Sequence, residues 1–187
     1  MNREELEHCL RAVADVTDKR ELYLAGSNSV LAHFPEDVIP AVCLEEAEVD
    51  VATVEDTEEN SYVISSTFWE GSDFVEMYGI EIDGIQLDEI ALPNGWQDRL
   101  KLIEITPPYD DSLISVYALD IYDVAASKTV AHREKDRRWL KALFDANLVS
   151  MGEVADRLNE MDLDFEHFMS LRKSLQAIVD GSDVTWV

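Results

Sequence analysis

Two acidic residues lie one position apart in the sequence Ala-Glu-Val-Asp-Val, which spans residues 47–51. Side chains alternate between the faces of a β-strand, so Glu48 and Asp50 share one face while the valines share the other. Two carboxylates on one face repel each other unless a cation lies between them. Magnesium is the cation we expect, because it prefers hard oxygen ligands and usually accompanies nucleotide phosphates. The alternative is the solvated face of an edge strand, which a chain with 40 acidic residues supplies often by chance.

Periodicity predicts the elements that must position these carboxylates. Apolar residues at helical spacing predict an amphipathic helix over residues 2–17, and an apolar stretch over residues 21–25 predicts a buried strand. A turn at Gly26–Ser27 ends that strand and precedes a short helix, an arrangement that an ordinary strand-to-helix turn shares. Residues 48–54 form the second predicted strand, and a helix is expected to begin near Asp56 and run to Phe68.

A third carboxylate comes from the stretch Phe74–Leu87, which alternates as a strand. Its apolar face carries Ile80 and Ile82 in this interpretation, and its polar face carries Glu81 and Asp83. The polar face of this strand therefore offers another oxygen ligand.

The pattern changes to helix in the last third of the chain. Residues 96–105 form the last predicted strand, and from Asp120 onward helices are expected, with helix starts at Asp120 and Ser150. Lys128 and Lys135 lie seven positions apart and share a face of the predicted helix. Six of the fifteen basic residues fall within fourteen positions here: Lys128, Arg133, Lys135, Arg137, Arg138 and Lys141.

Composition bounds the class of protein. With 187 residues, of which 47% are hydrophobic, the chain can build one compact folded unit. No apolar run approaches the roughly 18 residues that a membrane span needs, and the N-terminus lacks the pattern of a signal peptide, so we expect a cytoplasmic protein. Cys9 and Cys43 are far apart in sequence and predict buried thiols rather than a disulfide or metal framework.

The formal net charge of −25 bears on the partners of the protein. A phosphate backbone is bound by clustered Lys and Arg, so this charge argues against free association with nucleic acid and weighs against an RNA acceptor. Two kinds of explanation of the charge remain open: solubility or a salt-rich cytoplasm on the one hand, and association with a basic partner protein on the other.

A strand ending in glycine and serine, a strand with acid-apolar-acid and a third strand with another acid together resemble the nucleotidyltransferase superfamily with the polymerase-β-type fold. Three further segments, Leu92–Leu100, Leu119–Lys128 and Arg133–Asp136, look like a bacterial and archaeal family of largely uncharacterised nucleotidyltransferase-like proteins. That family is similar in turn to the AbiEii-type toxins of toxin–antitoxin systems. The resemblance covers about residues 20–160.

Pattern and resemblance together predict an α+β fold. We expect a small mixed sheet with flanking helices, a nucleotidyltransferase-like core, over residues 1–115. A C-terminal helical bundle over residues 116–187 is expected to pack on that core.

The resemblance also implies roles for the first site residues. Gly26 would let the backbone approach a nucleoside triphosphate, and the hydroxyl of Ser27 would bond the phosphate oxygens. Glu48 and Asp50 would hold Mg²⁺.

Further roles follow from the same resemblance. Asp83 would complete the carboxylate set, either as a metal ligand or as the base that takes the proton of an attacking hydroxyl, with Glu81 as the alternative. Lys128 would contact the leaving phosphates, and Arg133 and Lys135 would help to bind them.

The chain departs from the family pattern near the first acid. Relatives usually have Asp where this chain has Glu48, and the longer arm of glutamate can weaken or displace a metal. The preceding residues Glu45–Glu46 add a negative rim without compensating charge nearby in sequence. Lys128 has an alternative role as well, because it can pair with Asp123 or Asp136 on a helix surface. Catalytic competence is therefore open.

These observations lead to one principal hypothesis and one alternative. The first is a magnesium-dependent nucleotidyltransferase that moves a nucleoside monophosphate from a triphosphate to a hydroxyl of RNA or protein. Such an enzyme would act as the toxin of a toxin–antitoxin pair, with a cognate antitoxin as partner and no membrane. The alternative is a catalytically weak or inactive module of the same fold that binds nucleotide or a basic partner.

Overall fold

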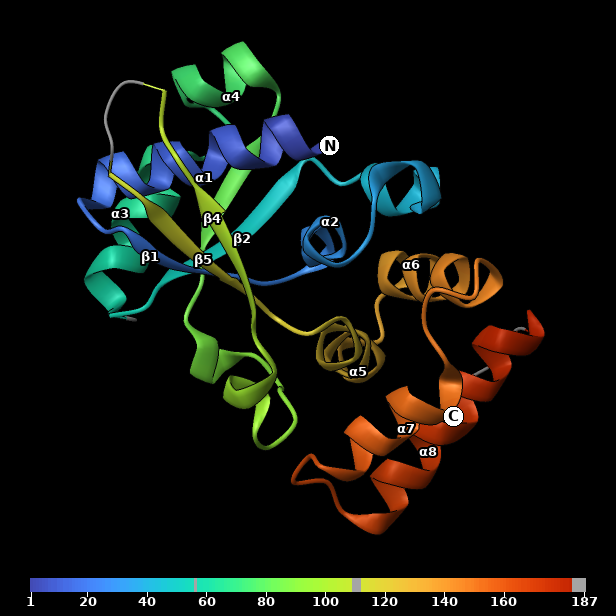
Figure 1. Cartoon of the computed structure of the whole chain (residues 1–187). Helices are drawn as coiled ribbons and strands as arrows, with labels where there is room; N and C mark the ends of the chain where they lie inside the picture. Colours follow the sequence, from blue (N-terminus) through green and yellow to red (C-terminus); the bar gives the residue numbers. More distant parts are fainter. Residues whose placement is uncertain (56, 109–111, 183–187) are drawn as a thin grey trace.

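The computed structural model describes residues 1–55, 57–108 and 112–182. Its centre is a five-stranded mixed sheet with the strand order β3-β2-β1-β5-β4 (Figure 1). Strand β1 pairs antiparallel with β2 and parallel with β5, β3 runs parallel to β2, and β4 runs antiparallel to β5. The strands span Glu21–Leu24 (β1), Glu48–Thr53 (β2), Glu81–Gly84 (β3), Lys101–Ile105 (β4) and Ile114–Ala118 (β5).

Helices flank this sheet, so the predicted α+β fold with a small mixed sheet is confirmed. Helices α1 and α3 pack against the sheet, and α5 to α8 gather beyond the end of β5 (Figure 1). None of the helices in the described ranges is long and apolar enough to span a membrane. The helices span Arg3–Thr17 (α1), Val30–His33 (α2), Glu58–Thr67 (α3), Asp73–Tyr78 (α4), Ile121–Ala131 (α5), Glu134–Asp145 (α6), Met151–Asn159 (α7) and Phe165–Asp180 (α8).

Strands β1, β2, β3 and β5 give the sheet one apolar face and one polar face. Alternate residues of β1, β3, β5 and the first half of β2 are buried, and their neighbours in the same strands are partly or fully exposed, whereas residues 51–53 at the end of β2 are all buried. Helix α1 packs on β1 and β2, and α3 packs on β2 and β3. The residues thus buried include Leu22, Leu24, Val49, Val51, Ile82, Ile114, Val116 and Ala118. The predicted alternation therefore holds, and the acidic side chains lie on the opposite face.

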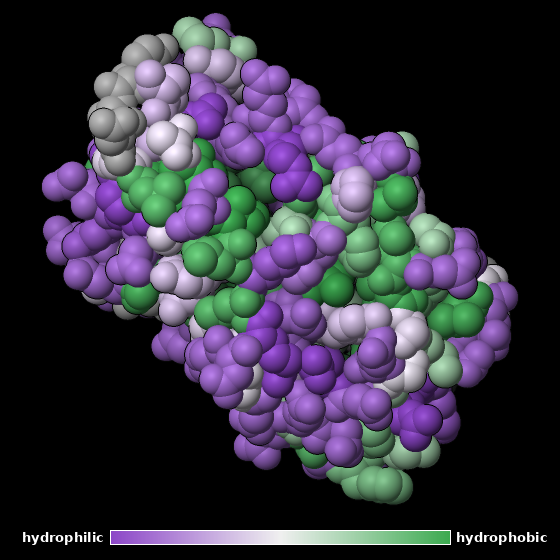
Figure 2. Space-filling model, viewed as in Figure 1, coloured by the Kyte–Doolittle hydropathy of each residue, from purple (hydrophilic) through white to green (hydrophobic). Residues whose placement is uncertain are grey.

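Figure 2 shows the surface as seen in Figure 1: it is largely hydrophilic, with apolar residues over the strands β4 and β5. Leu102 and Leu113 are among the exposed large apolar residues of this region. The two cysteines, Cys9 and Cys43, are free and buried, as predicted. Burial raises the pKa of each thiol to about 12.

The long strand predicted over Phe74–Leu87 is wrong in its first half. Residues 73–78 form α4, which begins at Ser72, whose side chain accepts a hydrogen bond from the N–H of Val75. The helix ends at Gly79, which has the left-handed φ of 68° that only glycine adopts easily. The strand is limited to β3, residues 81–84, but it still carries Glu81 and Asp83 on its polar face.

Two other elements differ from the prediction. Residues 96–99 form a 3₁₀ turn after Gly95, so the strand expected over residues 96–105 begins only at Lys101. Strand β5 was not predicted at all, although Ile114, Val116 and Ala118 alternate as a strand should. The predicted helix starts at Asp120 and Ser150 are confirmed, because both side chains cap α5 and α7. Asp56 lies outside the described residues.

A buried ion-pair network ties α5 to its neighbours. Asp123 of α5 is fully buried, and its carboxylate lies 3.0 Å from Nε of Arg99 and 2.9 Å from Nε of Arg157 in α7. Both arginines also face Glu160, at 3.4 and 3.6 Å. Arg99 therefore pairs with Asp123 and not with Asp98, its neighbour in sequence.

We predict that Asp123→Ala destabilises the fold strongly. Removal of the carboxylate leaves two largely buried guanidinium groups with only the more distant and partly exposed Glu160 as a shared partner, which costs about 3 kcal/mol. Urea denaturation measures this change in the free energy of unfolding. Asp98→Ala is the matched control, because Asp98 is exposed and is expected to change stability by less than about 0.5 kcal/mol. A similar small effect of both substitutions would contradict the role of this network.

Candidate functional site

Three carboxylates from two neighbouring strands converge on one point of the polar sheet face. Asp50 of β2 lies directly opposite Asp83 of β3 in the parallel ladder, and Glu48 precedes Asp50 on the same face. Each of the three offers an oxygen atom, and these atoms lie within 4.8 Å of one another. Oxygen ligands of Mg²⁺ at about 2.1 Å from the ion are about 3.0–4.2 Å apart, so small side-chain rotations suffice to bind it. The donor set and its spacing therefore fit a divalent cation.

Serines of α3 hold Asp83 in place. The hydroxyl of Ser65 donates to Oδ1 of Asp83 at 2.9 Å and accepts from the backbone N–H of Gly84 at 2.9 Å. The hydroxyl of Ser61, one helical turn earlier, donates to the carbonyl oxygen of Gly84. Ser61 and Ser65 were not predicted as part of the site, although serines four positions apart share one face of a helix.

Gly26 lies against the carboxylate of Asp50. The backbone N–H of Ala25 donates to the carbonyl oxygen of Asp50 at 2.9 Å, which brings the end of β1 against β2. Gly26 has φ 63° and ψ −161°, a conformation found essentially only in glycine. A Cβ atom there would overlap Oδ2 of Asp50. Glycine is therefore required twice, by its backbone conformation and by the approach of Asp50.

The residues after Gly26 are buried and bonded within the protein. Asn28 donates from its side-chain amide to the carbonyl oxygen of Glu48 at 2.6 Å, which anchors the start of β2. The hydroxyl of Ser27 donates to Oε2 of Glu46. Burial opposes ionisation of Glu46, but the Ser27 hydroxyl and the charges of Lys128 and Lys135 outweigh it and lower its pKa. The predicted phosphate ligand Ser27 thus has a carboxylate partner in this structure.

A cavity of about 440 Å³ opens beside Gly26 and Asp50. Lys128 and Arg133 line it from the helical side, and the segment after β3 lines it from below. The volume lies within the range of small-molecule sites. Most of the remaining lining is apolar: Ile85, Ile90, Ala91, Leu119, Val124, Val130 and Ala131. The cavity therefore joins charged groups that suit phosphates to an apolar wall that suits a planar base.

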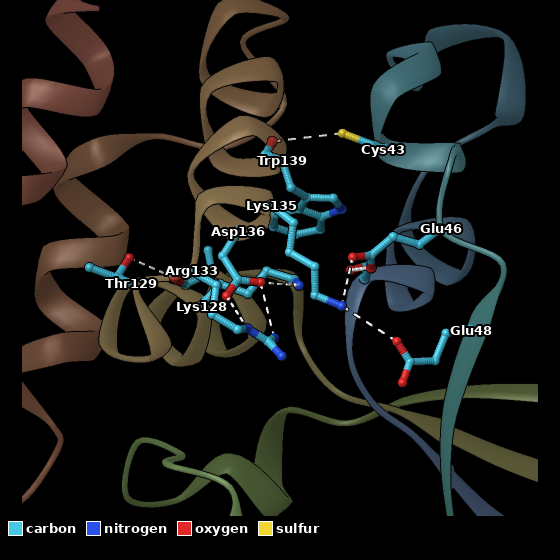
Figure 3. A network of polar contacts seen from close by, with 11 residues as sticks. Cys43, Glu46, Glu48, Lys128, Thr129, Arg133, Lys135, Asp136 and Trp139 are labelled. Atoms are coloured by element: carbon cyan, nitrogen blue, oxygen red, sulfur yellow. Dashed lines mark hydrogen bonds and ion pairs between the residues drawn. The ribbon is translucent and has the colours of Figure 1, made fainter. Parts of the chain in front are cut away.

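Lys128 and Arg133 are held by one buried carboxylate (Figure 3). Asp136 is fully buried; its Oδ1 lies 2.9 Å from Nζ of Lys128, and its Oδ2 lies 2.7 Å from Nε of Arg133. Nζ of Lys128 also lies 5.2 Å from the ring centre of Trp139. Burial opposes ionisation of Asp136, but hydrogen bonds from the two cations outweigh it and lower its pKa. Lys128 thus pairs with Asp136, one of the two partners considered above, but in the interior rather than on a helix surface.

Lys135 faces the acidic residues at the start of β2. Its Nζ lies 3.2 Å from Oε1 of Glu46 and 3.4 Å from Oε2 of Glu48 (Figure 3). The prediction that Lys128 and Lys135 share one helical face is wrong, because α5 ends at Ala131 and His132 adopts a left-handed φ of 55°. Lys135 of α6, which is far away in sequence, therefore supplies positive charge that compensates the acidic residues before and at the start of β2.

Comparison with models of known protein families shows the family to which the chain belongs. A family model described as a nucleotidyltransferase of unknown function (DUF6036) matches residues 4–178, almost the whole chain. The protein belongs to this nucleotidyltransferase family. Comparisons with curated proteins and with solved structures found no match.

Membership supports nucleotidyl transfer, for which a nucleoside triphosphate is the substrate. The acidic cluster of this nucleotidyltransferase is compatible with the divalent metal that such enzymes generally use. The narrower resemblance to AbiEii-type toxins stays a prediction, as do the roles of the individual residues.

The carboxylate cluster raises the free energy of the folded protein in the absence of a metal ion. Burial, followed by the charge of Glu48, raises the pKa of Asp50 to about 6, and Asp83 and Glu46 act in the same direction. A carboxyl group whose pKa is raised by folding binds its proton more tightly in the folded state. Asp50 therefore opposes folding above about pH 6, and this effect fades as the pH falls toward 4.

We predict that Asp50→Asn stabilises the metal-free protein. At pH 8 in the presence of a chelator, loss of the repelled charge is expected to raise the Tm by about 2–4 °C, equivalent to about 1 kcal/mol. The gain should shrink toward pH 4, where Asp50 of the wild type is protonated. The same substitution should abolish any rise of the Tm on addition of Mg²⁺. A lower Tm of the variant at pH 8 would contradict this electrostatic assignment.

We predict that Gly26→Ala prevents binding of Mg²⁺. The added methyl group must displace the carboxylate of Asp50 and strain the backbone, so the Mg²⁺-dependent rise of the Tm should disappear. Gly152→Ala in α7 is the control, because a Cβ there meets nothing within 4 Å. That variant is expected to be stabilised by about 0.5–1 kcal/mol and to bind Mg²⁺ as the wild type does. An unchanged Mg²⁺ response of Gly26→Ala would exclude the close-approach argument.

Proposed function

We propose that this protein transfers a nucleoside monophosphate from a nucleoside triphosphate to a hydroxyl group, with Mg²⁺ as cofactor. One observation carries the proposal: Glu48, Asp50 and Asp83 converge on one point, and Asp50 lines a cavity together with Gly26 and Lys128. Family membership supports the reaction class. In the reaction the acceptor oxygen bonds to the α-phosphorus, the bond from the α-phosphorus to the bridging oxygen breaks, and pyrophosphate leaves.

On the side of the sheet, the carboxylates have different roles. Glu48 and Asp50 would hold the cation, which when bound would neutralise phosphate charge and orient the triphosphate. Asp83 lies opposite Asp50 and is oriented by Ser65, so we assign it to complete the set and to take the proton of the attacking hydroxyl.

The cations act on the side of the helices. Lys128 and Arg133 line the cavity and would stabilise the negative charge of the departing pyrophosphate. Asp136 holds both side chains in place and is therefore a positioning residue. Lys128 and Arg133 share the one carboxylate of Asp136, so it does not occupy all of their N–H donors. Each cation therefore still has donors for phosphate oxygens.

The decisive experiment uses labelled nucleoside triphosphates, Mg²⁺, and total RNA and total protein as acceptors. We predict that label appears on one acceptor class and that Asp83→Asn reduces the rate at least about 10³-fold. Glu81→Gln is the matched control, because Glu81 lies on the same strand and face but outside the cluster of three. Its rate should stay within about threefold of the wild type. Equal losses in both variants would refute the assignment of Asp83.

The alternative, an inactive module of the same fold, is supported by Glu48. This residue replaces the usual Asp of relatives, and its carboxylate pairs with Lys135. Triphosphate that binds in the presence of Mg²⁺ without transfer to any acceptor would favour the module over the enzyme.

We also propose a toxin role with a basic antitoxin as partner. Residues 92–100, 119–128 and 133–136 resemble a nucleotidyltransferase-like family that is similar in turn to AbiEii-type toxins, and this resemblance supports the toxin role. The net charge of −25 favours a basic partner over free RNA. Expression of the wild type should slow the growth of a host cell, and expression of Asp50→Asn should not. Equal growth in both cases would remove this part of the proposal.

A further inference from the structure

Glu46 binds two of the groups to which the resemblance gives a role in binding the triphosphate, Ser27 and Lys135. Its Oε2 accepts a hydrogen bond from Ser27, and its Oε1 lies 3.2 Å from Nζ of Lys135. A carboxylate that accepts from a hydroxyl and an ammonium group at once makes the contacts that a phosphate oxygen pair would make. The tethered side chain and a bound phosphate therefore compete for the same donors.

Glu46 lies on a segment that can release it. Residues 45–47 form a loop without regular structure between the 3₁₀ turn Ala41–Leu44 and the start of β2. The side chain of Glu46 is about one quarter exposed, at 25%. It can therefore leave Ser27 by rotation about its own bonds, without movement of the sheet.

A second cavity lies where the released carboxylate would go. It has a volume of about 280 Å³ and lies next to Trp139, whose indole nitrogen is buried and has no hydrogen-bond partner among the described residues. Figure 3 shows this nitrogen on the side of the ring that faces Glu46. A buried N–H without an acceptor is unfavourable, so it would stabilise a carboxylate that enters this cavity. The lining comprises Val42, Glu45, Glu46, Lys135, Arg138 and Trp139.

We propose that Glu46 is an internal competitor of the triphosphate. Its carboxylate holds Ser27 and Lys135 in the ligand-free protein and moves toward Trp139 when phosphate takes these donors. The inference rests on the proposed function, and it adds Ser27 and Lys135, the phosphate ligands that the resemblance implies, to Lys128 and Arg133. It adds a residue that lowers the affinity for nucleotide and so sets the concentration at which the site fills.

The test is calorimetric binding of inorganic triphosphate in the presence of Mg²⁺. Glu46→Gln removes the competing charge and is expected to bind this probe roughly tenfold more tightly than the wild type, the equivalent of one charge-assisted hydrogen bond. Glu45→Gln is the matched control, because it removes the same charge from the same loop while its partner is Arg138. Its affinity should stay within about twofold of the wild type.

A second variant tests the place of the released side chain. Trp139→Phe keeps an aromatic ring beside Lys128 but removes the indole N–H, and it should bind the probe about threefold more weakly. An unchanged affinity would exclude Trp139 as the group that receives Glu46.

The outcomes separate this inference from the proposed function. If the wild type binds the probe and Glu46→Gln binds it equally or more weakly, Glu46 orients Ser27 and Lys135 for phosphate, and the competitor is excluded while the proposed function stands. If neither protein binds triphosphate with Mg²⁺, both proposals fail. Binding by Glu46→Gln alone would support both.

Discussion

Repulsion among carboxylates is the interaction on which the rest of the site depends. The β2–β3 register sets Asp50 opposite Asp83, and Glu48 joins them on the same face. A fold that places these charges together without a bound cation raises its own free energy, and the pKa of Asp50 is raised first by burial and then by the charges of Glu48, Asp83 and Glu46. The apolar faces of the same strands, packed against α1 and α3, provide the stability that makes this arrangement possible.

The opposing charge comes from one short part of the chain. No lysine or arginine occurs between Arg20 and Arg99, so the strands and loops on the acidic wall of the cavity cannot neutralise themselves. Lys128 and Arg133 reach the cavity only because α5 and the start of α6 dock beside the sheet, and Asp136 fixes both side chains from within the helical layer. The cavity therefore has both negative and positive groups in its lining only when α5 and α6 are packed beside the sheet.

Local periodicity predicted which carboxylates share a strand face, whereas contacts between elements that are far apart in sequence were revealed only by the structure. Alternation along a strand places Glu48 and Asp50 on one face whatever the partner strand is, and Asp83 follows by the same rule. The error over residues 74–80 arose because a short helix with apolar residues can mimic alternation, and its caps, a serine and a glycine, decide the matter. The left-handed His132 was not foreseen, because a single residue that breaks a helix leaves no periodic signal. Contacts between β2 and α6 join residues almost ninety positions apart, which no spacing rule can reach.

The length of Glu48 gives a physical meaning to its difference from the aspartate that the resemblance leads one to expect. With one methylene more than aspartate, its carboxylate contributes to the cluster around Asp50 and also contacts Lys135, which in turn holds Glu46. A cation at the cluster would draw the charge of Glu48 away from Lys135 and leave that ammonium with Glu46 alone. A phosphate then faces one competing carboxylate rather than two, so binding of metal favours binding of triphosphate. In the proposed function, the acidic site would thus accept a highly anionic substrate because a bound cation would change which of its own side chains are paired.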